Sequence, residues 1–98
     1  MARVLRSAEA EVDLYNIWFY IAVENKSKAS ADKFIRLLDD TFKRLAKNPK
    51  IAKSREKIYS TLRNFPKERH TIFYFPIADG VKMIRVLSSY RDIEPLFK

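Results

Sequence analysis

The spacing of apolar residues changes partway along the chain, and this change constrains the fold more than any other feature. Between residues 8 and 47, apolar side chains recur every three or four positions, which is the period of an amphipathic α-helix. Between residues 69 and 87, aromatic and β-branched residues gather in two short runs, which is typical of strands. Because helical segments precede these strands in one short chain, we expect an α+β fold in which helices cover one face of a mainly antiparallel sheet.

Two helices are predicted, joined by a short turn. The first covers Ala8–Glu24, where Ser7 is in position to cap the first turn and residues 25–27 interrupt the period. The second covers Lys28–Lys47 and ends before Pro49, since proline cannot continue a helix. So short a connection favours an antiparallel helix hairpin.

Four strands are predicted around this hairpin, at Ala2–Arg6, Tyr59–Phe65, Arg69–Ile77 and Val81–Leu87. Pro66 is expected to end the second strand, and residues 50–57 are expected to form a loop or a frayed turn. Asp79-Gly80 predicts a tight hairpin in which the only glycine takes a positive φ. The last three strands would form an antiparallel meander that completes one sheet with the N-terminal strand, in a single domain over residues 1–98. Residues 92–98 are either one turn of helix or a tail.

The first predicted helix carries more apolar surface than one contact with a sheet can bury. The stripe expected to face the core consists of Ala10, Leu14, Ile17, Trp18 and Ile21. A second apolar face consists of Val12, Tyr15, Phe19, Ala22 and Val23, while Asp13 belongs to a polar, largely acidic stripe. Monomers avoid exposing such a face, so either the second helix covers it or a partner does. Val12, Tyr15 and Phe19 are therefore candidate partner-binding residues.

The composition excludes several classes of function. Without cysteine, the chain can form no disulfide, no Cys-ligated metal site and no thiol nucleophile. One glycine is too few for a glycine-rich nucleotide-binding loop. No apolar run is long enough for a membrane span or a secretory signal, so we expect a cytoplasmic protein. We also expect no cofactor, no metal and no association with membranes.

The chain is strongly basic, with 20 Lys+Arg against 12 Asp+Glu and a formal net charge of +8. Residues 1–49 carry +2 and residues 50–98 carry +6, so an anionic partner should meet the second half. Charge alone does not distinguish nucleic acid, an acidic protein and an anionic lipid surface.

Catalytic chemistry has few candidates. His70, the only histidine, follows Arg69 on a predicted strand, where it is either a general base or a half-buried strand residue. No set of nucleophile, base and orienting group can be assigned from the spacing alone.

The arginines of the second half are more informative than the histidine. Four of them, Arg63, Arg69, Arg85 and Arg91, lie on or at the ends of the predicted strands, and a guanidinium suits phosphate or carboxylate. Arg85 interrupts an apolar run and would share a strand face with Met83 and Leu87 by the period of two. An internal ion pair, a position on the solvent-exposed side of the sheet and a contact with an anionic partner are all open for it.

Four blocks, in order along nearly the whole chain, carry a family resemblance. They are Ala10-x-x-Asp13-Leu14-x-x-Ile17-Trp18-x-Tyr20-Ile21-Ala22; Ala31-x-x-Phe34 with Leu38, Phe42, Leu45 and Pro49; Leu62-Arg63-x-Phe65-Pro66 with Ile72-Phe73-Tyr74; and Arg85-Val86-Leu87 with Arg91-Asp92-Ile93 and Leu96-Phe97. Together they resemble the RelE/ParE superfamily of type II toxin–antitoxin toxins, most closely its ParE-like (plasmid-stabilisation) branch.

The resemblance implies a toxin that inhibits DNA gyrase and is neutralised by a ParD-like, acidic-tailed antitoxin. The antitoxin tail would cover the second apolar face and pair with Arg63 and Arg85, while Arg91 and Phe97 are the candidates for target binding. DNA would be reached only through the complex with the antitoxin. A homodimer and a hetero-oligomer with the antitoxin both stay open.

RelE-like members of the superfamily instead cut mRNA on the ribosome with basic residues and a C-terminal tyrosine. Here Thr71 stands where they carry an arginine, residues 59–62 lack their lysines, and Phe97, which has no hydroxyl, replaces the tyrosine. We therefore predict no catalytic residues. The alternatives are a RelE-like ribosome-dependent mRNA endonuclease with a divergent basic site, or a non-toxic remnant that only binds antitoxin. The candidates for a nuclease are Arg69, His70, Arg85 and Arg91.

Overall fold

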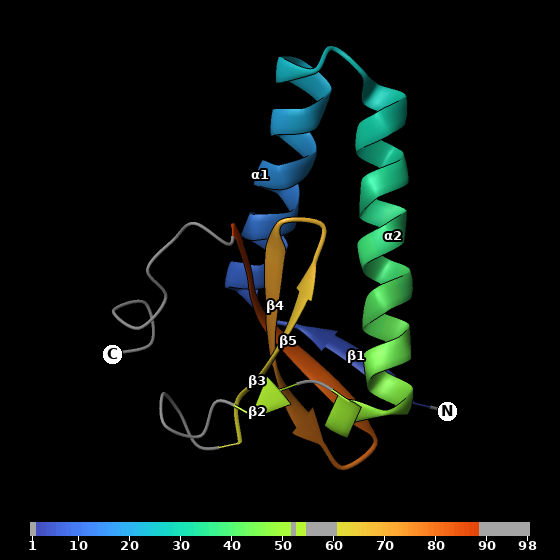
Figure 1. The fold of residues 1–98 in the computed structure, drawn as a ribbon, viewed down its shortest axis with the longest axis vertical. Helices are drawn as coiled ribbons and strands as arrows, with labels where there is room; N and C mark the ends of the chain where they lie inside the picture. The colour runs from blue at the N-terminus through green and yellow to red at the C-terminus, as the bar shows by residue number, and fades with distance from the viewer. Residues whose placement is uncertain (1, 52, 55–60, 89–98) are drawn as a thin grey trace.

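The computed structural model describes residues 2–51, 53–54 and 61–88, and its elements follow the predicted order (Figure 1). They are β1 (Arg3–Arg6), α1 (Ala8–Glu24), α2 (Lys28–Lys47), the 3-10 turn η1 (Pro49–Ile51), β2 (Lys53–Ser54), β3 (Arg63–Lys67), β4 (His70–Ile77) and β5 (Gly80–Ser88). One sheet has the order β1-β5-β4-β3-β2, with β1 parallel to β5 and the other neighbours antiparallel. The predicted α+β architecture is confirmed.

Both helices have the predicted bounds because their caps are encoded locally. The Ser7 hydroxyl accepts a hydrogen bond from the Ala10 N–H at 3.0 Å, and the Ser27 hydroxyl accepts one from the Ser30 N–H at 3.1 Å. The two helices run side by side in opposite directions (Figure 1). Within the described ranges, neither helix has the length and hydropathy needed to span a membrane.

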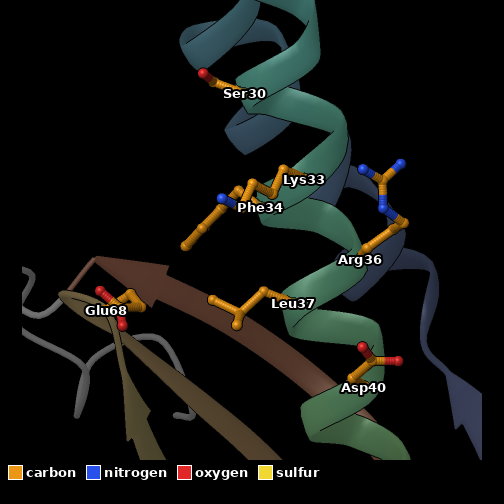
Figure 2. Close-up of a pocket in the computed structure, with 7 residues that line it drawn as sticks. All are labelled: Ser30, Lys33, Phe34, Arg36, Leu37, Asp40 and Glu68. Carbon is orange, nitrogen blue, oxygen red and sulfur yellow. The ribbon is translucent and has the colours of Figure 1, made fainter.

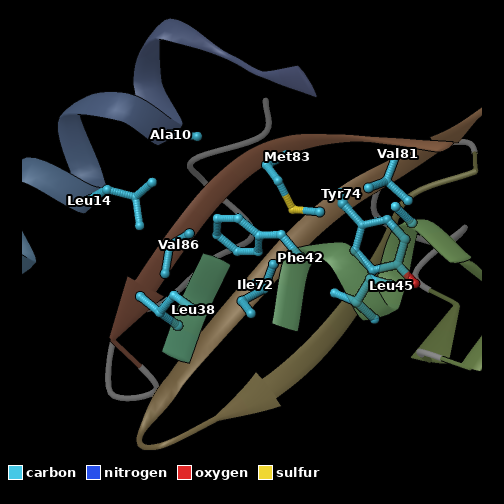
Figure 3. Close-up of a cluster of buried hydrophobic side chains, with 11 residues drawn as sticks. Ala10, Leu14, Leu38, Phe42, Leu45, Ile72, Tyr74, Val81, Met83 and Val86 are labelled. Carbon is cyan, nitrogen blue, oxygen red and sulfur yellow. The ribbon is translucent and has the colours of Figure 1, made fainter. Parts of the chain in front are cut away.

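The main core lies between the helix pair and one face of the sheet (Figure 3). Its buried members are Ala10, Leu14, Leu38, Phe42, Leu45, Ala46, Ile72, Tyr74, Val81, Met83 and Val86. The Tyr74 hydroxyl donates a hydrogen bond to the Pro49 carbonyl, which ties η1, directly after α2, to the sheet. Phe73 alternates with the core residues of β4 and packs with Leu62 and Leu87 in a small cluster on the opposite face.

The helix pair extends well beyond the strands (Figure 1). No side chain between Leu14 and Ala31 is buried, although Ile17, Trp18 and Ile21 are half-buried. The sheet therefore supports only the first half of α1 and the second half of α2, and the rest of the hairpin projects from the domain.

A β-bulge in β5 changes which residues face the helices. The β4–β5 register shifts by one residue, so that Ile84 has no partner in it. As a result Met83 and Val86 both belong to the main core, while Leu87 belongs to the opposite cluster. The prediction that Arg85 shares a face with Met83 is wrong, because a period of two does not continue across a bulge. Arg85 and Leu87 both follow the bulge, where they pair with Phe73 and Thr71 and keep the predicted alternation.

β3 runs through a proline that was expected to end it. Pro66 pairs with Thr71 of β4, whereas β2, the other neighbour of β3, pairs only with Arg63 and Asn64 among the described residues. The nitrogen of Pro66 can face this open edge, where no ladder hydrogen bond is lost.

The segment 50–57 is more ordered than predicted where the structure describes it. The end of η1 and the two residues of β2 fall within this expected loop. A strand of two residues is too short to produce a periodic signal, so pairing with β3 defines it. The predicted strand start at residues 59–60 and the predicted tail at 92–98 lie outside the described residues.

The β4–β5 hairpin is present, but glycine is required in it for a reason other than the predicted one. Ala78 and Asp79 form the turn, Ile77 pairs with Gly80, and Gly80 does not have a positive φ. That part of the prediction is wrong. A Cβ at Gly80 would lie 1.9 Å from the backbone oxygen of Arg3, so glycine is needed for the close approach of β1.

Candidate functional site

One side of α1 presents a row of apolar side chains to solvent. Val12, Tyr15, Phe19 and Val23, here called the α1 stripe, are 57%, 62%, 49% and 51% exposed. Their spacing of three and four residues places them on one helix face. Of the two explanations open from the sequence, coverage by α2 is excluded, because α2 leaves this face exposed. The stripe stays a predicted partner surface.

The two aromatic residues of the stripe are already arranged against each other. The ring centroids of Tyr15 and Phe19 lie 6.2 Å apart with planes inclined by 27°, which is a stacked pair. Tyr20, next along the helix, is 63% exposed but lies outside the row. The stripe therefore offers a partner an ordered aromatic platform.

Next to the stripe, an ion pair between α1 and β5 holds the helix on the sheet. Arg85 donates to Asp13 from Nε to Oδ2 at 2.8 Å and from Nη2 to Oδ1 at 3.0 Å. The backbone N–H of Val86 also donates to Asp13 Oδ2, at 2.9 Å. Placing Asp13 in the exposed polar stripe is therefore wrong: it is buried, because it lies on the helix face directed at β5. Arg85 takes the internal ion pair that the sequence left open.

α1 also supplies partners to the backbone groups around the β5 bulge. The Ser7 hydroxyl donates to the Ile84 carbonyl at 2.7 Å, while Asp13 accepts from Val86 on the other side. A bulge interrupts the ladder, so these groups need partners elsewhere. The ion pair could have been suspected from two signals, an acid one turn from Ala10 on the core face and an arginine inside an apolar strand.

The Arg85 guanidinium is held in its charged form. The hydrogen bond with Asp13 raises the pKa of Arg85, and partial burial opposes this only in part. A raised arginine pKa contributes stability at every pH below the ordinary arginine value, and this contribution is lost only as the pH rises above it. The ion pair is therefore not titrated from the arginine side near neutral pH.

The predicted partner-binding residues do not all meet. Val12 and Arg85 line the same small hollow of about 270 Å³ at the start of the stripe, together with Ala8, Glu9 and Asp13. Arg63 lies on β3, separated from β5 by β4, and so away from this hollow. The predicted target-binding residues, Arg91 and Phe97, lie outside the described residues.

The nuclease candidates are also divided. Arg69 and His70 line a hollow of about 570 Å³ between α1, the end of β5 and the β3–β4 turn. His70 Nδ1 lies 3.0 Å from the Glu68 carbonyl oxygen, and its ring centroid lies 5.4 Å from that of Phe34. Asp13, the one carboxylate among the described residues lining this hollow, is bonded to Arg85.

Arg85 is absent from the lining of this hollow, although its partner Asp13 belongs to it, and Arg91 lies outside the described residues. No group of three or more potential metal ligands occurs in the described part of the chain. The hollow combines Arg69, His70 and Asp13 with apolar side chains, and its described lining residues include no pair of carboxylates for acid–base chemistry.

Comparison with known proteins places this fold in a family. Residues 4–93 match the family model described as ParE toxin of type II toxin-antitoxin system, parDE. Two curated proteins called Toxin ParE1, from Mycobacterium tuberculosis strains CDC 1551 / Oshkosh and ATCC 25618 / H37Rv, are 28% identical over 94 residues and covered to 95%, as is this chain. The solved chromosomal ParDE TA system from P. aeruginosa contains a similar fold, with a TM-score of 0.69 and 14% identity over 90% of this chain and 96% of that one. Because the family match covers nearly the whole chain, this protein belongs to the ParE toxin family of type II toxin–antitoxin systems.

Proposed function

We propose that this toxin inhibits DNA gyrase in the cytoplasm and is neutralised by a ParD-like antitoxin that covers the α1 stripe. Membership of the ParE family supports two parts of this proposal, that the protein acts as a toxin and that its partner is an antitoxin. The observation that carries the antitoxin contact is the exposed row Val12, Tyr15, Phe19 and Val23.

The stripe has the character of a protein-binding surface. Stacked aromatic side chains are frequent anchors in protein interfaces, and apolar surface of this extent is unfavourable in water. At its lower end, Val12 lines a hollow with Glu9, Asp13 and Arg85, where Asp13 already holds the guanidinium, so contact of the antitoxin tail with Arg85 stays a prediction. Arg63, on β3, stays a predicted second contact.

Gyrase inhibition is tested with the purified full-length toxin. Relaxed plasmid and bacterial gyrase are incubated with increasing toxin, and supercoiling should be blocked or gyrase-dependent DNA cleavage should appear. Adding the antitoxin encoded beside the toxin should restore supercoiling. Unchanged gyrase activity at a large molar excess of toxin would remove the gyrase proposal and leave the family assignment intact.

The same preparation separates the nuclease alternative. Added to translating ribosomes, a RelE-like enzyme gives mRNA cuts at fixed codon positions, which primer extension detects. We expect no such cuts. If induction of the toxin causes no growth arrest and neither assay responds, the chain is a remnant that only binds antitoxin.

The antitoxin surface is tested by Tyr15→Gln combined with Phe19→Gln. Glutamine keeps helix propensity, and both side chains are about half exposed, so the free energy of unfolding should change by less than about 1 kcal/mol. Loss of two aromatic anchors should weaken antitoxin binding by on the order of 100-fold in calorimetry.

The matched control is Tyr20→Gln, which removes an equally exposed aromatic residue outside the row. It should leave antitoxin affinity within about threefold of the wild type. If the double variant unfolds, Tyr15 and Phe19 belong to the core. If it folds and binds antitoxin normally, the antitoxin contacts another surface.

A further inference from the structure

The outer face of α2 is a strongly cationic surface. α1 contains four acidic residues and no Lys or Arg, whereas α2 contains six Lys and Arg against three Asp. Five of the six cations lie on the helix face opposite the core and are exposed, and we call this the α2 cationic face: Lys33, Arg36, Lys43, Arg44 and Lys47. Two helices that lie side by side therefore carry opposite charge, with α1 acidic and α2 basic.

Most of this charge is not neutralised. Lys43 pairs with Asp39 at 3.2 Å, and Asp39 is shared with Arg6 at 2.6 Å. The other four cations form no ion pair with any residue in the described ranges. Asp40 is the one acid on the face. Figure 2 shows Arg36 and Asp40 on the side of α2 that faces away from Glu68.

We propose that the α2 cationic face binds the phosphate backbone of duplex DNA directly, without the antitoxin. Exposed cations bind phosphates by charge, and such contacts carry no sequence information. The resemblance implies contact with DNA only through the antitoxin complex, so this site adds a second route. It goes beyond gyrase inhibition and does not depend on it.

The chemistry of the face favours duplex DNA over an acidic protein. Protein interfaces are anchored by large apolar side chains, and the exposed large hydrophobic residues of the described chain lie on β1 and α1, none on α2. Single-strand binders also need aromatic side chains on which bases stack, and the face has none. Cations that follow one helix face without apolar anchors suit a line of phosphates.

The dimensions are compatible with this ligand. Residues 33 to 47 span about 21 Å of helix at 1.5 Å per residue. A duplex carries one charge per about 1.7 Å of its axis, so phosphates are available along the whole face. If four cations contact phosphates, the slope of log K against log salt should be about −3.6.

The experiment measures fluorescence anisotropy of a labelled duplex of about 20 bp, titrated with the full-length toxin at several salt concentrations. The wild type should lose on the order of 100-fold in affinity between about 50 and 200 mM salt. The test variant combines Arg36→Gln, Arg44→Gln and Lys47→Gln, which preserve helix propensity. Its affinity should fall at least about tenfold, and its slope should become shallower by about 2.7.

The matched control removes the same charge elsewhere, with Lys26→Gln, Lys28→Gln and Lys82→Gln, all at exposed positions off the face. It should bind within about threefold of the wild type. Equal losses in the two variants would show that net charge alone drives binding and would overturn the proposal, as would the absence of duplex binding at low salt. Displacement of the duplex by an equal concentration of polyglutamate would assign the face to an acidic protein instead. Circular dichroism confirms that both variants are folded.

Discussion

At the scale of the residue, Asp13 determines how α1 lies on the sheet. Its carboxylate accepts from two nitrogens of Arg85 and from the Val86 N–H, and its side chain is only 9% exposed. The Arg85 side chain is 21% exposed, so an unpaired guanidinium there could be only partly hydrated. Losing one partner of such a pair costs more than the pair itself contributes.

Asp13→Ala should lower the free energy of unfolding by about 3 kcal/mol, because it leaves the guanidinium and the Val86 N–H without a partner. Urea unfolding followed by circular dichroism measures this loss. Glu9→Ala, which removes an exposed acid one turn earlier, should change stability by less than about 0.5 kcal/mol. Adding Arg85→Met to Asp13→Ala should restore part of the loss. A stability of Asp13→Ala equal to that of Glu9→Ala would contradict the role assigned to the pair.

Gly80 is the second residue with a position-specific role. In Gly80→Ala the new methyl would meet the Arg3 backbone, which cannot move aside as a flexible side chain does. We expect a loss of at least about 2 kcal/mol and weakened pairing of β1 with β5. Urea unfolding and amide exchange of β1 measure the two effects.

The neighbouring variant Asp79→Ala is the control for this turn. It removes the ion pair that Arg3 Nε makes with Asp79 Oδ2 at 3.1 Å, in which both side chains are more than half exposed. Exposed ion pairs contribute little, so the loss should be less than about 1 kcal/mol. If Gly80→Ala is no less stable than Asp79→Ala, the close approach of β1 does not constrain this position.

At the scale of the element, the end of a helix or strand can be predicted from sequence when residues next to that end determine it. The bounds of α1 and α2 are predictable because Ser7, Ser27 and Pro49 act within one turn of the helix. β2 and the continuation of β3 through Pro66 depend on strands distant in sequence, which a local pattern does not contain.

One part of the candidate site can likewise be predicted from sequence and another part cannot. The α1 stripe follows from helix periodicity, so Val12, Tyr15 and Phe19 can be predicted as one face and as surplus to the core. The pair Asp13–Arg85 depends on the β5 bulge, which reverses the strand alternation at one residue. Neither residue reveals the bulge by itself.

The β3–β4 turn has a backbone conformation that is sterically unfavourable for the residues in it. Glu68 and Arg69 have φ values of 48° and 65°, so both central residues lie in the left-handed region. Two-residue hairpin turns of this kind prefer Asn-Gly, since other residues pay a steric cost there. The turn lies against both helices, where Glu68 lines one hollow with α2 and Arg69 lines another with α1.

Glu68→Asn with Arg69→Gly should raise the free energy of unfolding by about 1 kcal/mol, because the new residues relieve the steric cost. Thermal and urea unfolding both measure it. The control is Ala78→Gly in the other two-residue turn, where φ is not positive; glycine there should lower stability by about 0.5–1 kcal/mol. If the Asn-Gly variant is less stable than the wild type, side-chain contacts of Glu68 or Arg69 outweigh the backbone cost.

At the scale of the whole molecule, the domain consists of a sheet-supported half and a projecting helix hairpin. The projecting part contains no buried side chain between Leu14 and Ala31, and Trp18 Nε1 donates across it to Asp32 Oδ1 at 2.8 Å. The α1 stripe crosses the boundary, because Val12 lines a hollow with Arg85 of β5 and Val23 is the last residue but one of α1. A partner on the stripe would therefore contact both halves.

Because burial rather than helix propensity supplies most helix stability, the projecting hairpin should open without unfolding of the sheet. In hydrogen exchange, amides of residues 17–28 should exchange at least about 100-fold faster than those of β4 and β5. Trp18, the only tryptophan, reports the same event, so its fluorescence in urea should change before the far-ultraviolet circular dichroism of the domain. Antitoxin bound on the stripe should slow exchange in 17–28 and make the two transitions coincide, since ligand binding adds its free energy to the region it orders. Equal protection of the hairpin and the sheet in the free toxin would show that the helices unfold only with the core, and the projecting half would then be as rigid as the rest.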